Sequence, residues 1–600
     1  MKHSRPRGAF ARVQQRAASL LTFSIVCVSA TLIAACSGGG STTTGTGSAT
    51  DNSTVTSTAT ALTVVKAAVD CSQLASVDVS DIGGTGSKIT SATVSTATVD
   101  GTTVSYCNVK GVLAPANNFQ VALPVSTWTQ RFAALGCGGL CGSLRDATSQ
   151  ANFSFSYKCP LVQQGGFVTA TTDMGHQGNG TDWTTDIQKQ ADFAYRGQHI
   201  TTLAAKKLIK AYYGQAQKYS YFIGCSDGGR EALMAAQRYP ADYNGIVAGA
   251  PAAHFQIQNS VFHGWSVVAN STTGNSSGNA ILYPDKIALL HKAVVAACAD
   301  TPDGLISDPR ACNFNPASIE CPVGATDTSK CLTSAEVDAA SKIYGGPTDA
   351  STSAPMQAGR PLLGSEVNWP GVEAPGTGTA AGTPVPVTTG IFSYNIVAGA
   401  YNLIFTGSPT MPTIDTFGYS DSNFYATYLA ANHLLNDATN PDLSAFQKGG
   451  GKLILWHGLA DQHISPRYTI AYYEAMQNQM GQAVVDQFSR MYLVPGVGHC
   501  GGGEGLANID LVSQVTAWVE KDAAPASVVT YRTDTAGTVT ASRPVYPYPA
   551  VARYTGNGDW HDAANYTSGS PLYNVRTPSW PGSIFYTPYA PKQQGVATPS

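Results

Sequence analysis

A serine between two glycines is the first feature of this sequence that indicates catalysis. Residues 224–228 read Gly-Cys-Ser-Asp-Gly, after the β-rich run 221–223 and before the helix-like stretch 230–238. A strand, a sharp turn and a helix around G-x-S-x-G expose a serine hydroxyl at the carboxyl end of a parallel sheet. The alternative is a glycine-rich loop whose serine only caps the helix. We predict that Ser226 is a nucleophile.

A nucleophilic serine needs a base, and the base needs a carboxylate that orients it. Asp461 follows the apolar run 452–458, and His499 follows the apolar run 491–495. Both positions lie beyond strand ends, where parallel sheets place their chemistry, and they keep the chain order serine, acid, histidine. We therefore expect Asp461 to orient His499, and His499 to take the proton of Ser226. The weaker candidates are His457 and His463 for the base and Asp510 for the acid.

Two cysteines flank the proposed nucleophile and base. Cys225 directly precedes Ser226, and Cys500 directly follows His499. If the serine and the histidine lie within hydrogen-bonding distance, the cysteines become neighbours that a disulfide can join across 274 intervening residues. The alternative is two unrelated cysteines, one of them a free thiol.

The composition is that of a folded, exported protein. Of its 600 residues, 43% are hydrophobic, which is enough to bury a sizeable core. Only 12% are charged, roughly half of the ~25% usual in soluble domains, while 61 glycines supply part of a neutral surface. The formal net charge of −3 leaves no strongly basic surface, so a nucleic acid partner is not expected.

The N-terminus also indicates export. Basic residues precede an apolar stretch, which is typical of a signal peptide at 1–35. Small residues before Cys36 resemble a bacterial lipobox, which predicts lipidation of Cys36 and an outer-membrane lipoprotein in the periplasm or at the cell surface. The alternatives are ordinary cleavage with secretion, or a transmembrane anchor. Residues 36–65 predict a flexible Ser/Thr/Gly tether, and the lipid is the only membrane contact that we expect.

The remaining cysteines predict a disulfide-bonded body. Without Cys27, in the signal peptide, and Cys36, 11 of the 13 cysteines remain, so at least one is unpaired or pairs with another chain. A structural zinc is disfavoured, because Cys137-x3-Cys141 has no second half. In an oxidising compartment three close pairs are expected to form local disulfides, namely Cys71 with Cys107, Cys298 with Cys312, and Cys321 with Cys331.

Four longer motifs carry a resemblance to a known family. They are YFIGCSDGGREALMAAQRYPADYNGIVAGAP at 221–251, GKLILWHGLADQ at 451–462, VPGVGHCGGG at 494–503 and WVEKDAAP at 518–525. The sequence resembles the tannase/feruloyl esterase family, including its mono(2-hydroxyethyl) terephthalate hydrolase branch, from about residue 70 to 559. The resemblance implies an α/β-hydrolase core with a large inserted lid, acting on carboxylic esters of aromatic acids.

The spacing of the motifs supports an inserted domain. About 200 residues separate the strand before Pro251 from the strand that begins at Lys452, against roughly 2–6 in an ordinary connection. We therefore assign 66–253 and 446–559 to the two parts of the core, and 254–445 to the lid. Residues 560–600 form a Pro/Tyr-rich tail beyond the resemblance.

The resemblance extends to residues around the reacting carbonyl. An oxyanion hole needs two N–H donors, of which one follows the nucleophile, at Asp227. The match to a glycine-rich motif places the other donor at Gly139. Cys137 replaces the usual glycine of that motif, and its candidate disulfide partners are Cys141 and Cys159. We assign three residues to substrate binding, namely Gly138, His457 and Ile464.

Charge in the lid favours a neutral substrate. Lys and Arg are absent from 361–447, whereas six carboxylates give that stretch a formal charge of −6. The terephthalate half-ester hydrolases are thought to bind the free substrate carboxylate with an arginine from this part of the lid. Because an unpaired buried carboxylate is costly, we favour esters of ferulic, gallic or similar phenolic acids over terephthalate half-esters. Two further functions stay open, namely an acyltransferase and a non-catalytic surface-binding lipoprotein.

The segment 298–312 resembles a calcium loop in the lid of the family. Its oxygen donors would come from Asp300, Asp303, Leu305 and Asp308, because carboxylates and carbonyls suit a hard cation. The loop is about three residues short, and a solvated acidic turn is the alternative. For catalysis itself no cofactor is expected.

Overall fold

The computed structural model of the protein describes residues 60–99, 101–148, 159–178, 180–379, 382–405, 411–423 and 433–589. All of them belong to one unit, residues 54–600. The predicted signal peptide, the lipidation site Cys36 and most of the predicted tether lie outside the described residues. Within the described ranges, no helix combines the length and the apolar character needed to cross a bilayer.

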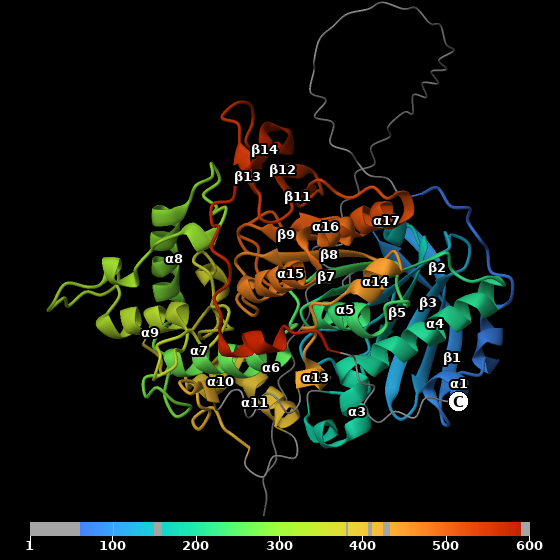
Figure 1. The fold of residues 1–600 in the computed structure, drawn as a ribbon, viewed down its shortest axis with the longest axis horizontal. Coiled ribbons are helices and arrows are strands. Elements are labelled where there is room, and N and C mark those ends of the chain that lie inside the picture. Colours follow the sequence, from blue (N-terminus) through green and yellow to red (C-terminus); the bar gives the residue numbers. More distant parts are fainter. Residues whose placement is uncertain are drawn as a thin grey trace, which may run out of the picture. The chain divides into compact units, whose positions relative to one another are not determined.

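A nine-stranded sheet has the order β1-β2-β3-β5-β4-β6-β7-β8-β9 (Figure 1). Strands β1, β2, β3 and β5 pair antiparallel, whereas β5, β4, β6, β7, β8 and β9 are parallel. Strands β4, β7 and β8 are almost continuously buried, as expected where both faces of a parallel sheet are covered. The bounds are β1 (Lys88–Val99), β2 (Thr102–Leu113), β3 (Asn117–Pro124), β4 (Arg131–Leu135), β5 (Phe167–Thr172), β6 (Tyr219–Cys225), β7 (Gly245–Gly249), β8 (Lys452–Gly458) and β9 (Ser489–Val494).

Alternate side chains of the parallel strands enter two separate hydrophobic cores. Phe222 of β6 belongs to a core with α4, α5 and α15, while its neighbours Tyr221 and Ile223 belong to a core with α17. This alternation is that of a strand buried on both faces. The helices of the core are α1 (Ser80–Gly83), α2 (Pro160–Gln163), α3 (Ile187–Ala191), α4 (Gly197–Tyr213), α5 (Asp227–Arg238), α14 (Ser444–Lys448), α15 (Pro466–Met480), α16 (Gln482–Phe488) and α17 (Leu511–Lys521).

Between β7 and β8 the chain forms the inserted domain. Its described residues contain helices and isolated β-bridges, with no further strand among them. One of its hydrophobic cores includes Phe262 and Tyr401, and another includes Leu290 and Trp369. The helices are α6 (Phe255–Ile257), α7 (His263–Ala269), α8 (Pro284–Cys298), α9 (Ser334–Gly345), α10 (Val387–Gly390), α11 (Phe392–Ile404) and α13 (His433–Asn436).

Disulfides link neighbouring segments in both domains. The three predicted local pairs are bonded, namely Cys71–Cys107, Cys298–Cys312 and Cys321–Cys331. Of the two candidate partners of Cys137, the structure selects Cys141. Among the described cysteines, Cys159 is the free one, and it is buried.

The C-terminal region adds two small sheets, followed by the tail. One sheet consists of β10 (Asn508–Ile509), β11 (Val528–Thr533) and β12 (Val539–Val545), and the other of β13 (Val551–Tyr554) and β14 (Tyr566–Gly569). In the tail, Gly582 O accepts a hydrogen bond from His254 Nε2 at 2.9 Å, at the start of the lid. Tyr589 O accepts one from Asn440 Nδ2 at 2.9 Å, near the end of the lid. The tail therefore contacts both connections between lid and core.

Candidate active site

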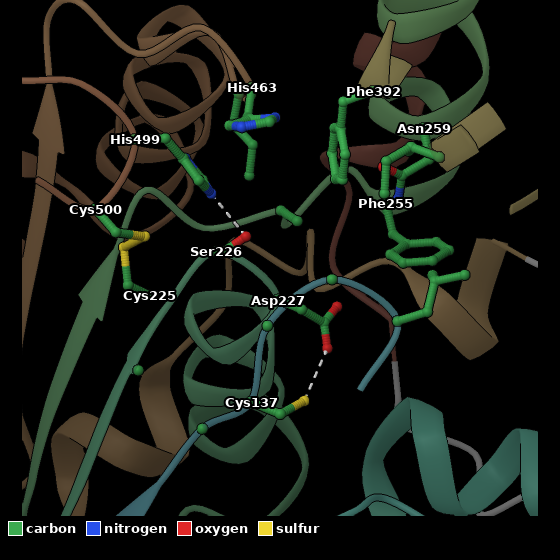
Figure 2. A pocket seen from close by; sticks show the side chains of 18 of the residues that line it. Cys137, Cys225, Ser226, Asp227, Phe255, Asn259, Phe392, His463, His499 and Cys500 are labelled. Carbon is green, nitrogen blue, oxygen red and sulfur yellow. Dashed lines mark hydrogen bonds between the residues drawn. A yellow bond between two sulfur atoms is a disulfide. The ribbon is translucent and has the colours of Figure 1, made fainter. Parts of the chain in front are cut away.

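The turn after β6 holds Ser226 in a strained backbone conformation. Ser226 has φ +67°, between the end of β6 and the start of α5. A β-carbon at Gly224 would lie 2.1 Å from the carbonyl oxygen of Gly228, so strand and helix approach this closely only because position 224 is glycine, while a β-carbon at Gly228 would lie 2.8 Å from the carbonyl oxygen of Cys137. This is the geometry that the G-x-S-x-G motif predicts, and it directs the serine hydroxyl into a pocket (Figure 2).

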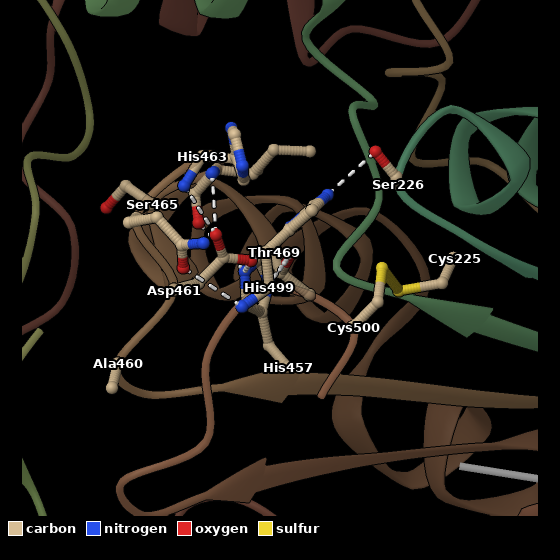
Figure 3. Close-up of polar contacts among 12 residues, drawn as sticks. Cys225, Ser226, His457, Ala460, Asp461, His463, Ser465, Thr469, His499 and Cys500 are labelled. Atoms are coloured by element: carbon tan, nitrogen blue, oxygen red, sulfur yellow. Dashed lines mark hydrogen bonds and ion pairs between the residues drawn. A yellow bond between two sulfur atoms is a disulfide. The ribbon is translucent and has the colours of Figure 1, made fainter. Parts of the chain in front are cut away.

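Ser226, His499 and Asp461 form one hydrogen-bonded series (Figure 3). His499 Nε2 lies 2.8 Å from Ser226 Oγ, and His499 Nδ1 lies 2.7 Å from Asp461 Oδ2. Asp461 follows β8 and His499 follows β9, so adjacent parallel strands deliver the two residues. An imidazole that contacts the hydroxyl with one nitrogen and the carboxylate with the other is arranged for general base catalysis.

Three hydrogen bonds besides that of His499 fix the Asp461 carboxylate. Oδ1 accepts from the backbone N–H groups of His463, at 2.7 Å, and Ile464, at 2.9 Å, while Oδ2 also accepts from His457 Nε2 at 3.0 Å. Burial acts to raise the pKa of Asp461, but the charge of His499 and the hydrogen bonds of both histidines outweigh it and hold the pKa well below its usual range. Asp461 is therefore a carboxylate at any working pH.

His457 lies behind the acid and not at the substrate. It is buried, with Nε2 on Asp461 and Nδ1 2.8 Å from Thr469 Oγ1, and it does not line the pocket. The prediction that His457 binds substrate is therefore corrected to a role in supporting Asp461. The physical reason is its place within β8, where the strand points the ring into the core rather than past the strand end.

The two other weak candidates occupy different places. His463 lines the pocket, with its ring 4.9 Å from that of His499. Burial, followed by the charge of His499, holds the pKa of His463 well below its usual value, so the ring is neutral. Asp510 instead caps α17, where its Oδ1 accepts the N–H of Ser513 at 2.8 Å.

A disulfide joins Cys225 to Cys500, with an S–S distance of 2.05 Å. Figures 2 and 3 show it beside the contact between Ser226 and His499. Because one sulfur belongs to the residue before Ser226 and the other to the residue after His499, the bond covalently links the two turns that carry these side chains.

The predicted oxyanion donors lie in the same pocket. Gly138 and Gly139 line it together with Asp227, the first residue of α5, and Gly139 has φ +63°. The first N–H groups of a helix have no partner within the helix and carry a partial positive charge. Gly139 and Asp227 therefore line the same cavity as Ser226, and their role as oxyanion donors stays a prediction.

The pocket is a cavity of about 320 Å³ between core and lid. Phe255, Phe392 and Ile396 supply apolar walls from the lid, and Asn259 and His263 add polar groups. Burial lowers the pKa of His263 to about 3, so this ring is neutral as well. Ile464 lines the cavity, as predicted.

A cation reaches this pocket from the core. Arg145, in the loop after β4, lines the cavity, and a β-carbon at Gly138 would lie 3.1 Å from its Nη2 atom. The lid segment 361–447 indeed lacks lysine and arginine, but the core supplies an arginine to the pocket. The expectation from the sequence concerned only cations in the lid, and Arg145 becomes a pocket residue only because the fold brings the 137–145 loop to the lid.

The residues of the predicted calcium loop do not fit a calcium ion. Each of the three carboxylates is bound to an arginine: Asp303 Oδ1 lies 2.6 Å from Arg543 Nη2, Asp308 Oδ2 lies 2.7 Å from Arg310 Nη2, and Asp300 Oδ2 lies 3.4 Å from Arg553 Nη1. The carbonyl of Leu305 accepts from Thr301 Oγ1 at 2.8 Å. Calcium takes six to eight converging oxygens, whereas here guanidinium groups supply the positive charge to a shortened loop.

We predict that this loop is stabilised by arginine and not by calcium. Replacing Arg543 with Gln leaves the largely buried Asp303 without its charged partner and is expected to cost about 2–3 kcal/mol of stability. Thermal unfolding measures this loss, and Arg553→Gln, at a more exposed pair, is the control, with less than about 1 kcal/mol. A rise in Tm on adding calcium, reversed by a chelator, would contradict the prediction.

The described residues hold one cluster of potential metal ligands, formed by Cys137, Cys141, Asp227 and Glu231. Its two sulfurs are joined to each other, and Asp227 is bound by Arg230 through contacts of 2.6 and 2.9 Å. No local sequence pattern indicates this cluster, because its second half comes from α5, about 90 residues after the cysteines.

Comparison with known sequences finds relatives of this chain. A sequence model of the family described as tannase and feruloyl esterase matches residues 100–569. A probable feruloyl esterase of Arthroderma benhamiae is 31% identical over 491 residues, covering 78% of this chain and 86% of that protein. The mono(2-hydroxyethyl) terephthalate hydrolase of Piscinibacter sakaiensis is 29% identical over 537 residues, covering 78% of this chain and 85% of that enzyme.

Solved structures share the fold. Feruloyl esterase B from Aspergillus oryzae superposes with a TM-score of 0.67 at 24% identity, over 83% of this chain and 100% of that one. Tannin acyl hydrolase from Aspergillus niger gives a TM-score of 0.64 at 20% identity, over 86% of this chain and 97% of that one. The predicted fold class, an α/β-hydrolase core with a large insertion, is confirmed.

Proposed function

The chain belongs to the tannase and feruloyl esterase family of carboxylic ester hydrolases, and we propose that it is an exported serine esterase for phenolic aromatic acids. The observation that carries the proposal is the unbroken series of hydrogen bonds from Ser226 Oγ through His499 to Asp461. The series opens into a cavity with aromatic walls, which suit a flat acyl group.

In the proposed reaction, His499 Nε2 takes the proton of Ser226 Oγ as this oxygen attacks the ester carbonyl. The amides of Gly139 and Asp227 bind the oxygen that becomes negative. The imidazolium of His499, held by Asp461, then gives its proton to the departing alcohol and leaves an acyl-enzyme. Water attacks this ester with the same histidine as base and releases the acid.

Export is part of the proposal. The 1–35 segment has the features of a signal peptide, and the described part of the chain holds five disulfides. Disulfides in such number persist in oxidising compartments. We also propose lipidation at Cys36, which would anchor the enzyme to a membrane surface through the part of the predicted 36–65 tether that precedes Thr60. From Thr60 onward the segment is bound to the core, because the N–H of Thr60 donates to Glu520 Oε2 at 3.0 Å and that of Val65 to Trp128 O at 2.9 Å.

Covalent labelling tests the nucleophile. A fluorophosphonate probe is expected to modify the wild-type protein once and to leave Ser226→Ala unmodified, as read by intact-protein mass spectrometry. The same preparation is then assayed on methyl ferulate, methyl gallate and a terephthalate half-ester. An unlabelled wild type would contradict the esterase mechanism, whereas transfer to an added alcohol in preference to water would identify an acyltransferase.

Hydrolysis of terephthalate half-esters is the second candidate function, and Arg145 is the observation that favours it. A guanidinium group that lines the acyl cavity can form a paired hydrogen bond with a carboxylate at the far end of the substrate. Esters of phenolic acids need no such partner. We keep the phenolic esters first, because the lid stretch 361–447 contributes only negative charge to its surroundings.

Arg145→Gln separates the two substrate classes. The change is expected to lower kcat/KM for a terephthalate half-ester by about 10- to 100-fold, the usual effect of removing a charged hydrogen bond. It should change kcat/KM for methyl ferulate by less than about 3-fold, because that acyl group is neutral. Steady-state kinetics on both esters measures the difference. Equal losses on both substrates would mean that Arg145 supports the loop rather than selects the acyl group.

A further inference from the structure

We propose that Glu231 is a positioning residue of the oxyanion hole, because its side chain holds the loop that carries Gly139 against the helix that begins after Ser226. This inference rests on the proposed serine mechanism. Glu231 lies in α5, five residues after the nucleophile, and its side chain is buried. The proposed reaction gives it no chemical step.

Both backbone groups of Cys137 are bound to α5. The N–H of Cys137 donates to Glu231 Oε1 at 3.0 Å, and its carbonyl accepts the N–H of Gly228 at 3.0 Å. A β-carbon at Gly136 would lie 2.5 Å from the α-carbon of Gly228, so the loop and the helix touch backbone to backbone. With Cys137 fixed in this way, the next residues along the loop are the ones that line the pocket.

The loop beyond Cys137 is short and closed. The disulfide from Cys137 to Cys141 spans Gly138, Gly139 and Leu140, so any movement of Cys137 is passed to the proposed donor at Gly139. The other proposed donor, the amide of Asp227, belongs to α5 itself. Glu231 therefore sets the distance between two donors that come from different segments of the chain.

The charge of Glu231 matters because the negative oxygen of the transition state forms nearby. Burial, followed by the charge of Asp227, raises the pKa of Glu231 to about 8, so the carboxyl group is neutral at pH 7. Oε2 is buried and has no hydrogen-bond partner among the described residues, as suits a neutral acid better than an ion. Above pH 8 ionised Glu231 would place a second negative charge beside Asp227, against the developing oxyanion.

The groups around Glu231 only partly offset its burial and the charge of Asp227. The charge of Arg230, which is itself bound to Asp227, lowers the pKa of Glu231 most, followed by the hydrogen bond from the Cys137 N–H and the charge of Arg145. Cys137 and Cys141 are in disulfide form and cannot donate a proton. The other polar groups that share a small cavity with Glu231 come from η4 (Asp192–Arg196), α4 and the segment before β7, namely Tyr195, Gln198, His199, Tyr239, Asp242 and Tyr243.

Two substitutions test separately the acceptor oxygen of Glu231 and its negative charge. Glu231→Gln keeps an oxygen for the Cys137 N–H and cannot ionise, whereas Glu231→Leu removes the acceptor. We expect Glu231→Leu to lower kcat by about 10- to 100-fold with KM nearly unchanged, somewhat less than the loss of an oxyanion donor itself. Glu231→Gln should retain kcat within about 3-fold at pH 7. Above pH 8 the wild-type kcat should fall, while that of Glu231→Gln should stay level.

Gln237→Leu is the matched control, because it removes another buried polar side chain of α5, which donates to Ala438 O at 2.9 Å, far along the helix from the loop. It should lower Tm without the pH effect. Full kcat in a folded Glu231→Leu would overturn the proposal. If that variant does not fold, a kcat that changes in the same way above pH 8 for wild type and for Glu231→Gln would overturn the proposal. Activity retained by Ser226→Ala would instead contradict the proposed function on which this inference rests.

Discussion

Asp461→Asn is expected to lower kcat by about 10⁴-fold while the protein stays folded, as when a serine hydrolase loses the acid that sets its histidine tautomer. Oδ1 of Asp461 accepts two backbone N–H groups, so the asparagine must keep its oxygen there and turn its NH₂ group toward His499. His499 Nδ1 then has to accept a hydrogen bond. Its proton moves to Nε2, which can no longer take the proton of Ser226.

His457 provides the control for this prediction. It donates to the same Asp461 oxygen from the side away from the substrate, at 3.0 Å. His457→Gln should lower kcat by at most about 10-fold, because Asp461 keeps its charge and its contact with His499. Both variants are compared by kcat on methyl ferulate and by Tm. A value for Asp461→Asn within about 10-fold of wild type would contradict the role of Asp461 as the orienting acid.

The residues that the sequence predicts well are those next to strands with strong local signals. Ser226, Asp461 and His499 each follow an apolar run, and the parallel order of β6, β7, β8 and β9 brings those strand ends to one edge of the sheet. The disulfide between Cys225 and Cys500 follows from the same geometry. Each of these cysteines is next to Ser226 or His499 in the chain, so the two sulfurs lie close together where the serine and the histidine are in contact.

The predictions that needed correction, and the contacts that no prediction covered, depend on distant segments with no local pattern. Arg543 pairs with Asp303 across 240 residues, and no spacing within the 298–312 loop could show that an arginine would take the place of a cation. The contact of Glu231 with Cys137 spans 94 residues. His457 stands near the end of an apolar run, where a pocket residue would also be expected. Only the direction of its side chain from β8 keeps it out of the pocket. Such features depend on packing geometry, which hydrophobic pattern and motif spacing do not contain.

The double variant Cys225→Ser and Cys500→Ser is expected to lose both stability and rate. The disulfide closes a loop with a sequence separation of 275 residues, and loop-closure entropy for that length gives an upper value of about 6 kcal/mol. The loss of rate follows from position. Ser226 and His499 lie on separate loops, and freeing one relative to the other by about 1 Å can cost about 100-fold in rate.

The control for this variant is Cys321→Ser with Cys331→Ser, a lid disulfide with a sequence separation of 10. That bond closes a short loop far along the chain from the triad, so its removal should cost less stability and leave kcat unchanged at a temperature well below Tm. Unfolding in urea and kcat at 25 °C measure the two effects separately. If the double variant at Cys225 and Cys500 loses stability but keeps its full kcat, hydrogen bonds alone align the serine with the histidine, and the disulfide serves only the fold. A fall in kcat in the still-folded protein would mean that the covalent link sets the distance across which the proton moves.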